Sequence, residues 1–374
     1  MSNIHVSLVG GQSLPVYKTA LSMKPDKVIL ICSKQTRGTA STIQKLLAQK
    51  IDAEFKIKIF ETDDLDLIKK EIDNLVEDIH DDDDVVVNVT GGIKTWSILF
   101  YREFSNLRYQ CIYVDQNDKV WDLTSSERID ITMEKIPLEE IFRLNNVIIK
   151  SKHEITDYTE EDLRVLSDIK TLRKYNFDDF NYLTRELSCR PDLTSVIARD
   201  NSSICWDREE KMFKCDFFHK GKLMTKNLKS PNVRKLLLNT GWFEYEVARF
   251  LSEWPSAKKV WMNIEFSTER LGDRPVNEVD IIVETEQKIL FVEVKTKVFK
   301  PTDIDKFNDV VRNLGGLASK RIFITENAMD ENASEKCNLN KIRHFAMSEI
   351  AAGESQTNKF FKTLDDYMKS INEK

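Results

Sequence analysis

Short apolar segments alternate with amphipathic segments along the first 150 residues of the chain. Four of the apolar segments are rich in branched aliphatic side chains and end in polar residues, which predicts buried β-strands at His5–Val9, Lys27–Cys32, Glu54–Phe60 and Val85–Val89. Between them, apolar side chains recur at helical spacing, as over Leu65–His80. Repeated strand–helix units of this kind predict an α/β fold with a doubly wound, mostly parallel sheet of the Rossmann-like type.

The pattern changes near residues 145–155. We expect residues 130–185 to be mostly helical, and residues 204–228 to form short strands with a turn at His219–Lys222. Beyond them the pattern predicts helices at Val233–Leu238, Trp242–Ser252 and Thr302–Leu314, and strands at Val260–Phe266, Val279–Val283, Ile289–Val294 and Arg321–Thr325. We therefore expect an N-terminal domain over residues 1–148, a helical and β connecting region over 149–232, and a second α/β domain over 233–374.

Two carboxylates lie inside the apolar strands of a predicted β-hairpin at residues 277–295. The two apolar runs flank a polar turn, so Asp280 and Glu293 would lie opposite each other. Because side chains alternate along a strand, Lys295 shares the face of Glu293. Two acids and a lysine at one point suit a phosphodiesterase that depends on Mg²⁺ or Mn²⁺. The alternative is an edge hairpin whose Asp, Glu and Lys form surface salt bridges.

Small polar residues follow three of the predicted strands in the first domain, at Gly10–Ser13, Ser33–Thr36 and Thr90–Thr95. Ligands of open parallel sheets bind beyond the carboxyl ends of the strands, and glycine lets the backbone approach them closely. The helix expected to begin near Ile93 would attract a phosphate, and Lys94 adds a positive charge. Neither a Walker A loop nor a dinucleotide fingerprint is present, which disfavours ATP and NAD. The alternative is an ordinary domain in which the paired glycines only form a tight turn.

Composition and charge limit the possible function classes. Hydrophobic residues make up 41% and charged residues 32% of the 374 residues, which indicates a globular protein, and no apolar run approaches the roughly 20 residues of a membrane span. No secretory signal is visible and the six cysteines form no Cys-x-x-Cys pair, so we expect a cytoplasmic protein without a membrane partner. The net charge of −6 argues against a protein that coats nucleic acid. Residues 205–235 are nevertheless basic, and form either a nucleic-acid track or a solvated face.

The order of elements around the hairpin resembles the PD-(D/E)XK nuclease fold. A helix, three strands with Glu-x-Lys on the third, a helix and a further strand follow one another over roughly residues 235–330. The matching residues are Asp280, Glu293 and Lys295. Val279 stands where the family name has proline, and the surrounding Asn-Glu-Val-Asp is the form typical of the CRISPR-associated branch of that family.

This resemblance implies a role for each matching residue. Asp280 and Glu293 would bind the metal directly, together with the backbone carbonyl of Val294. Glu244, on the preceding predicted helix, occupies the position of a further acidic ligand, and would bind a second cation or orient a water molecule. Lys295 would lie beside the attacking water or the phosphate.

Residues 88–95, Asn-Val-Thr-Gly-Gly-Ile-Lys-Thr, resemble the signature of the CARF domain, the sensor for cyclic oligoadenylates in CRISPR systems. The loops Gly10–Ser13 and Ser33–Thr36 occupy the places of its other ligand loops. The resemblance covers about residues 1–140, and implies a homodimer that holds one cyclic ligand between its two copies. The residues that would contact this ligand are Gln12, Ser13, Ser33, Thr90, Gly91, Gly92, Lys94 and Thr95.

Together the two halves resemble the CARF–PD-(D/E)XK effectors of type III CRISPR systems. That resemblance implies a homodimeric, metal-dependent endonuclease activated by cyclic tetra-adenylate, which cuts single-stranded or nicked DNA and, in some members, RNA. One alternative is a regulator that binds nucleic acid without cutting it. Another is a DNA-repair or restriction nuclease whose N-terminal domain binds a different nucleotide or only dimerises.

Overall fold

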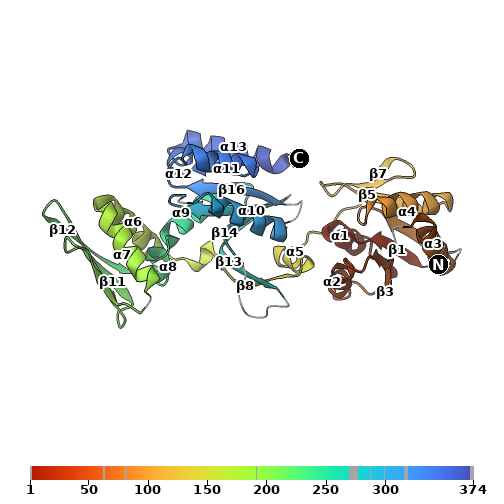
Figure 1. The fold of residues 1–374 in the computed structure, drawn as a ribbon, viewed down its shortest axis with the longest axis horizontal. Coiled ribbons are helices and arrows are strands. Elements are labelled where there is room, and N and C mark those ends of the chain that lie inside the picture. Colours follow the sequence, from red (N-terminus) through yellow and green to blue (C-terminus); the bar gives the residue numbers. More distant parts are fainter. Residues whose placement is uncertain are drawn as a thin grey trace.

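Three β-sheets follow one another along the long axis of the molecule (Figure 1). The computed structural model describes residues 2–61, 64–80, 82–190, 192–268, 277–286, 288–298, 300–315 and 319–370. A seven-stranded sheet lies at the N-terminal end, a six-stranded sheet in the middle and a four-stranded sheet at the other end. Within the described ranges, no helix is both long enough and apolar enough to cross a bilayer.

The N-terminal sheet has the strand order β3-β2-β1-β4-β5-β6-β7, in which the first five strands are parallel and the β5–β6 and β6–β7 pairs are antiparallel. Its strands are β1 (Asn3–Leu8), β2 (Lys27–Cys32), β3 (Glu54–Ile59), β4 (Asp84–Asn88), β5 (Gln110–Val114), β6 (Val120–Asp122) and β7 (Glu127–Ile129). The helices that connect the parallel strands are α1 (Leu14–Met23), α2 (Arg37–Leu47), α3 (Leu65–Glu77) and α4 (Lys94–Asn106). The predicted doubly wound, mostly parallel sheet is confirmed.

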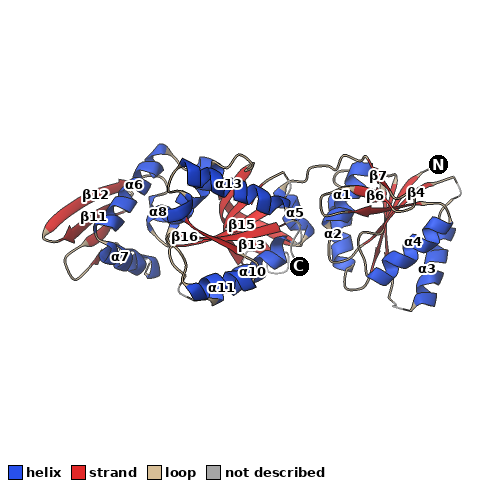
Figure 2. Ribbon diagram, turned by 90° about the horizontal axis from the view of Figure 1, so that it is seen from above, coloured by secondary structure: helices blue, strands red, loops and turns tan. Residues whose placement is uncertain are grey.

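Helices cover both faces of this sheet (Figure 2). Phe100 of α4 shares a core with Val6 and Val87 on one face, and Val16 of α1 shares a core with Val28 on the other. From β1 the chain proceeds outward to β2 and β3, then returns to place β4 on the other side of β1. This change of direction opens a crevice beyond the carboxyl ends of β1 and β4, where ligands of such sheets bind.

The middle sheet has the order β17-β16-β15-β14-β13-β8. Its strands are β8 (Val147–Glu154), β13 (Lys259–Thr268), β14 (Asn277–Glu284), β15 (Ile289–Lys295), β16 (Ser319–Thr325) and β17 (Arg343–Ala346). One face carries α9 (Gly241–Ser252), α12 (Met347–Ile350) and α13 (Glu354–Lys369), and the other α5 (Leu138–Leu144), α10 (Thr302–Gly315) and α11 (Glu331–Leu339). The predicted hairpin is confirmed, because β14 and β15 pair antiparallel.

The third sheet has the order β12-β11-β10-β9, with strands β9 (Ser195–Ile197), β10 (Ser203–Asp207), β11 (Met212–His219) and β12 (Lys222–Lys229). A short 3₁₀ turn (Ile155–Asp157) precedes α6 (Glu160–Tyr175), α7 (Phe177–Cys189) and α8 (Val233–Leu237), whose apolar side chains share a core with this sheet. The predicted turn is confirmed, since His219 pairs with Lys222. Part of the basic segment is neutralised, because Lys226 pairs with Asp168 and Lys229 with Glu210.

The expectation that residues 130–185 are mostly helical is wrong over Val147–Glu154. These eight residues form β8, an edge strand of the middle sheet that pairs with β13. Edge strands commonly carry charged side chains, and Lys150, Lys152 and Glu154 break the apolar alternation that identifies a strand. Residues 147–154 therefore extend the sheet that carries the predicted hairpin.

Candidate functional site

The β14–β15 hairpin brings two carboxylates together at its open end. Strand pairing aligns Ile281 with Val292, so the next position along the strands aligns Asp280 with Glu293. The Val294 amide donates a hydrogen bond to Oδ2 of Asp280 at 2.8 Å, which fixes this carboxylate at the strand edge. The N–H and C=O groups of a paired antiparallel residue point to the same edge, so the Val294 carbonyl faces this side as well.

The ammonium of Lys295 lies between the two acids. Its Nζ is 3.2 Å from Oδ2 of Asp280 and 2.7 Å from Oε1 of Glu293. The three side chains that the sequence singles out therefore meet at one point. Burial opposes the charge on Lys295, but Asp280 and Glu293 outweigh it and raise the pKa of this ammonium above its ordinary value. Lys295 is thus a permanent cation at neutral pH.

A third carboxylate approaches from the first turn of α9. Asn263 Nδ2 donates a hydrogen bond to Oε2 of Glu244 at 2.6 Å. Asn263 lies within β13 with a φ of 48°, a left-handed conformation in which asparagine is one of the few tolerated side chains. At the start of α9, a Cβ on Gly241 would overlap the Lys235 carbonyl oxygen, so only glycine permits the turn that positions Glu244.

The three glutamates of this cluster have raised pKa values. Desolvation and the nearby Asp280 charge raise the pKa of Glu244 to about 8, although Asn263 opposes the shift. The same two causes raise the pKa of Glu293 to about 7, against the effect of Lys295. Desolvation and Asp280 also raise the pKa of Glu278. Several carboxylates crowded in one desolvated place can all ionise only when a cation is bound among them. This makes the cluster a functional-site candidate.

The oxygen donors at this point suit a hard divalent cation such as Mg²⁺ or Mn²⁺. Carboxylate oxygens and a backbone carbonyl are the ligands that these ions prefer. In the part of the chain that the structure describes, no group of three or more Asp, Glu, His or Cys side chains is arranged so that it could hold a metal ion, so a metal here would rely on two carboxylates and the backbone carbonyl. Lys295 lies between Asp280 and Glu293, so a cation bound by both acids would take the place that this ammonium occupies.

Three further charged residues, which the sequence did not indicate, border the cluster. Glu278, Asp303 and Lys306 line a cavity of about 120 Å³ together with Glu293 and Lys295. A signal for the first was present, because Glu278 lies two residues before Asp280 on the same strand face. The other two belong to α10, and only the packing of this helix on β15 brings them to the site.

A second candidate site lies at the crevice of the N-terminal sheet. A cavity of about 410 Å³ opens there, lined by the loops after β1, β4 and β5 and by Ile141 and Asn145 of the α5 region. Five of the eight residues expected to contact a ligand line this cavity, namely Gln12, Ser13, Thr90, Gly91 and Gly92. Ser33, Lys94 and Thr95 are not among its lining residues, and their role stays a prediction.

The glycines of this crevice allow two loops to cross at close range. A Cβ on Gly91 would overlap the Leu8 carbonyl oxygen, and one on Gly10 would lie 2.7 Å from the Gly92 amide nitrogen. Gly92 has a φ of 77°, which favours glycine. The Thr90 hydroxyl accepts a hydrogen bond from the Val114 amide at 2.8 Å. The backbone of these loops is therefore held in one shape around the cavity.

Two of the predicted contact regions have other structural surroundings. The Ser33 amide donates to the Thr36 hydroxyl at 3.1 Å, and that hydroxyl donates to the Val9 carbonyl, so this loop forms a closed turn. Lys94 and Thr95 are exposed in the first turn of α4. They follow Gly92 by two and three residues, and thus lie close in sequence to the rim of the cavity.

The short helix α5 belongs to both halves of the molecule. Leu144 is part of the core beneath α1 and α2, whereas Phe142 is part of the core beneath α10. Asn145, which lines the N-terminal cavity, donates a hydrogen bond to the Leu314 carbonyl in the last turn of α10 at 3.1 Å. Earlier turns of α10 carry Lys306 and line the cavity beside Glu293. A continuous chain of contacts therefore connects the two candidate sites.

Comparison with known proteins assigns the first third of the chain. Residues 4–141 match the family model of the Card1 CARF domain. No curated protein matches the sequence.

Solved structures share the fold of the chain. Protein VC1899 from Vibrio cholerae is 15% identical, with 96% of this chain and 98% of that chain covered and a TM-score of 0.72. Can2 from Sulfobacillus thermosulfidooxidans, in complex with cyclic tetra-adenylate, is 17% identical, with 98% and 100% covered and a TM-score of 0.70. A type III CRISPR defence DNA nuclease activated by cyclic oligoadenylate is 15% identical, with 87% and 45% covered and a TM-score of 0.52. At these identities the similarity establishes the fold alone.

Proposed function

We propose that this protein is a metal-dependent endonuclease of type III CRISPR antiviral defence, activated by a cyclic oligoadenylate. The observation that carries the proposal is the meeting of Asp280, Glu293 and Lys295 at the open end of one hairpin. Its support is the match of residues 4–141 to the Card1 CARF domain and the shared fold with Can2, whose structure contains cyclic tetra-adenylate. The substrate we propose is single-stranded or nicked DNA, with single-stranded RNA as a second substrate.

Asp280 and Glu293, with the Val294 carbonyl, would hold Mg²⁺ or Mn²⁺, and Glu244 would hold a second cation or a water molecule. Such a cation supplies Lewis-acid stabilisation of the phosphate and makes a bound water more acidic. The protein positions these oxygens in advance. Val294 fixes Asp280, and Asn263 fixes Glu244 through hydrogen bonds of 2.8 and 2.6 Å.

Lys295 would act as a cation rather than as a proton acceptor. Its neighbours Asp280 and Glu293 keep it protonated against the effect of burial, so it can donate hydrogen bonds to a phosphate oxygen or to the attacking water. In hydrolysis the water oxygen bonds to phosphorus while the bond from phosphorus to the leaving sugar oxygen breaks. An ammonium next to the phosphate would stabilise the negative charge that develops in this step.

The N-terminal crevice would bind the activator, with cyclic tetra-adenylate as the proposed ligand. Its volume of about 410 Å³ lies at the lower end of the range of roughly 300–1,000 Å³ for sites of drug-sized ligands. A ring of four nucleotides is larger than such ligands, so a second copy of the chain would supply the other half of the site. Ile93, Ile98 and Tyr101 of the adjoining α4 region are exposed apolar side chains suited to that homodimer contact.

Activation would pass through α5. Ligand bound in the crevice contacts Ile141 and Asn145 on one side, and Asn145 holds the last turn of α10 on the other. A cavity of about 680 Å³ between α2 and the ends of β13 and β14 leaves room for the two halves to move. A shift of α10 would change the position of Lys306 and Phe307 beside Glu293.

The experiment that tests this proposal measures cutting and ligand binding separately. Labelled single- and double-stranded DNA and RNA are incubated with Mn²⁺, with and without each cyclic oligoadenylate, using the full chain and its Lys295→Ala variant. We expect cutting only with activator, and no cutting by the variant, which still binds cyclic tetra-adenylate in calorimetry. Full cutting by Lys295→Ala would refute the active site, and absence of ligand binding would refute the sensor.

A further inference from the structure

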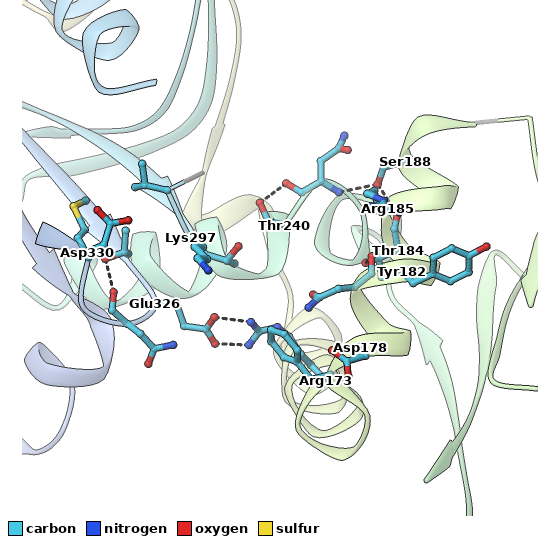
Figure 3. Close-up of a pocket in the computed structure, with 18 of the residues that line it drawn as sticks. Arg173, Asp178, Tyr182, Thr184, Arg185, Ser188, Thr240, Lys297, Glu326 and Asp330 are labelled. Carbon is cyan, nitrogen blue, oxygen red and sulfur yellow. Dashed lines mark hydrogen bonds and ion pairs between the residues drawn. The ribbon is translucent and has the colours of Figure 1, made fainter. Parts of the chain in front are cut away.

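A large cleft adjoins the catalytic residues, between α7 and the carboxyl ends of β15 and β16 (Figure 3). Its volume is about 1340 Å³. Thr296 and Lys297, which directly follow Lys295, line the cleft. Thr240, at the start of α9, lies on the same wall, four residues before Glu244. The cleft therefore reaches the two backbone segments from which Lys295 and Glu244 project.

The wall opposite these residues is α7, which presents aromatic rings to solvent. Phe177 is 53% exposed and Tyr182 is 41% exposed, and both line the cleft. Arg185, one turn along the helix from Tyr182, has a side chain that is 69% exposed. Large rings left in solvent are available to stack on another flat group, and a neighbouring guanidinium can pair with a phosphate.

The floor of the cleft is held in place by Arg173. Its guanidinium pairs through two hydrogen bonds with the Glu326 carboxylate, as Figure 3 shows. The same guanidinium lies 4.7 Å from the ring centre of Phe177 and 4.9 Å from that of Trp242. This clamp connects α6, α7, α9 and the loop after β16. The ion pair with Glu326 neutralises the charge of Arg173. The guanidinium lies over one face of the Phe177 ring, which leaves the other face for contact.

The charge of the lining decides which form of nucleic acid fits. Its cations Arg173, Arg185 and Lys297 are matched in number by the acids Asp178, Glu326 and Asp330. Duplex binding depends on neutralising many phosphates, which a balanced lining does not offer. Single strands are bound instead by bases stacked on aromatic rings together with a few cations. Amide and hydroxyl groups, which suit base edges and sugars, make up much of the remaining wall.

We propose that this cleft binds a single strand of nucleic acid on one side of the scissile phosphate. Bases stack on Tyr182 and Phe177, while Arg185 and Lys297 contact the phosphates. The inference rests on the proposed nuclease function and adds to it the surface that would hold an unpaired strand, because the lining suits stacked bases better than a duplex. DNA and RNA share the stacking and phosphate chemistry, so the two are separated by experiment.

The test is fluorescence anisotropy of the full chain with labelled oligo-dT, oligo-U and a hairpin duplex of equal length, in EDTA to prevent cutting. Stacking of one base contributes about tenfold in affinity, so Tyr182→Ala should weaken oligo-dT binding by roughly that factor. Tyr182→Phe keeps the ring and should bind as the parent protein does. Equal losses for oligo-dT and oligo-U would assign the cleft to both sugars, and a loss confined to one would assign it to that one.

Trp121→Ala is the matched control, because Trp121 is 38% exposed on the N-terminal sheet, outside this cleft. It should leave oligonucleotide affinity unchanged, and thermal unfolding confirms that each variant is folded. Unchanged oligo-dT and oligo-U binding by Tyr182→Ala, or tighter binding of the duplex than of either single strand, would overturn the inference. Tyr182-dependent binding without any cutting in Mn²⁺ would instead remove the nuclease function and leave the cleft as a binding site.

Discussion

Replacing Glu293 by glutamine should stabilise the metal-free protein in a pH-dependent way. The Glu293 side chain is only 15% exposed, and it faces Asp280 across the open end of the hairpin. Desolvation and the Asp280 charge raise its pKa from 4.5 to about 7, although Lys295 acts in the opposite direction. Glutamine has nearly the same shape but cannot ionise, so the variant removes an unfavourable charge.

The direction of this pH dependence follows from proton binding. The folded protein holds the Glu293 proton more tightly than the unfolded chain does, so the parent loses stability as pH rises from about 4.5 to about 7. The difference between these two pKa values corresponds to about 3 kcal/mol. Glu293→Gln cannot ionise at this position, so it does not lose this free energy of unfolding. It should therefore exceed the parent by about 3 kcal/mol in free energy of unfolding at pH 8, and by less than about 1 kcal/mol at pH 5.

Urea unfolding of EDTA-treated protein at pH 5 and pH 8 measures this difference. Glu253→Gln, an exposed acid at the end of α9, is the matched control and should change stability little at either pH. Adding Mn²⁺ at one hundred times its dissociation constant should stabilise the parent by about 2.7 kcal/mol, and Glu293→Gln by much less. Equal stability of parent and variant at pH 8, or an equal gain from Mn²⁺, would refute the electrostatic reasoning.

Three further outcomes follow from the geometry of the two sites. Gly91→Ala should abolish binding of cyclic tetra-adenylate in calorimetry, because the added Cβ overlaps a carbonyl oxygen. Gly38→Ala is the control and should bind normally, because its added Cβ has no atom within 4 Å. Tight binding by Gly91→Ala would contradict this. Asn145→Leu should lose most of the activated cutting rate even when the activator is saturating, since it breaks the hydrogen bond to α10; full activation under saturation would exclude this route. With the pKa of Glu293 at about 7, Mn²⁺ affinity of the site formed with Asp280 should rise about tenfold between pH 6 and pH 8, because bound metal requires the ionised acid; a flat calorimetric profile would count against this ligand.

The hairpin and its acids could be predicted from sequence because the signal was local. Two apolar runs lie symmetrically about one turn, so Asp280 and Glu293 had to face each other once the strands paired. Parallel strands with glycine-rich ends likewise identified Thr90, Gly91 and Gly92 as a lining of the crevice. In both cases the strand period and the direction of the chain are enough to place the side chains.

Contacts between distant elements could not be predicted in this way. Asn263 reaches Glu244 only because it adopts a left-handed conformation within β13, which no apolar pattern reveals. Lys306 and Asp303 reach the site through the packing of α10. The connection from Asn145 to α10 spans 169 positions of sequence and depends on how the two halves meet. Such long-range placements arise from tertiary packing, which local sequence propensity does not predict.

The most direct test of the catalytic centre is a crystal of the full chain soaked in Mn²⁺ and measured for anomalous scattering. We expect a peak bound by carboxylate oxygens of Asp280 and Glu293, with the Lys295 ammonium moved aside from its position between them. An empty cluster, with manganese bound elsewhere or nowhere, would contradict the assignment of these residues to metal-dependent cutting.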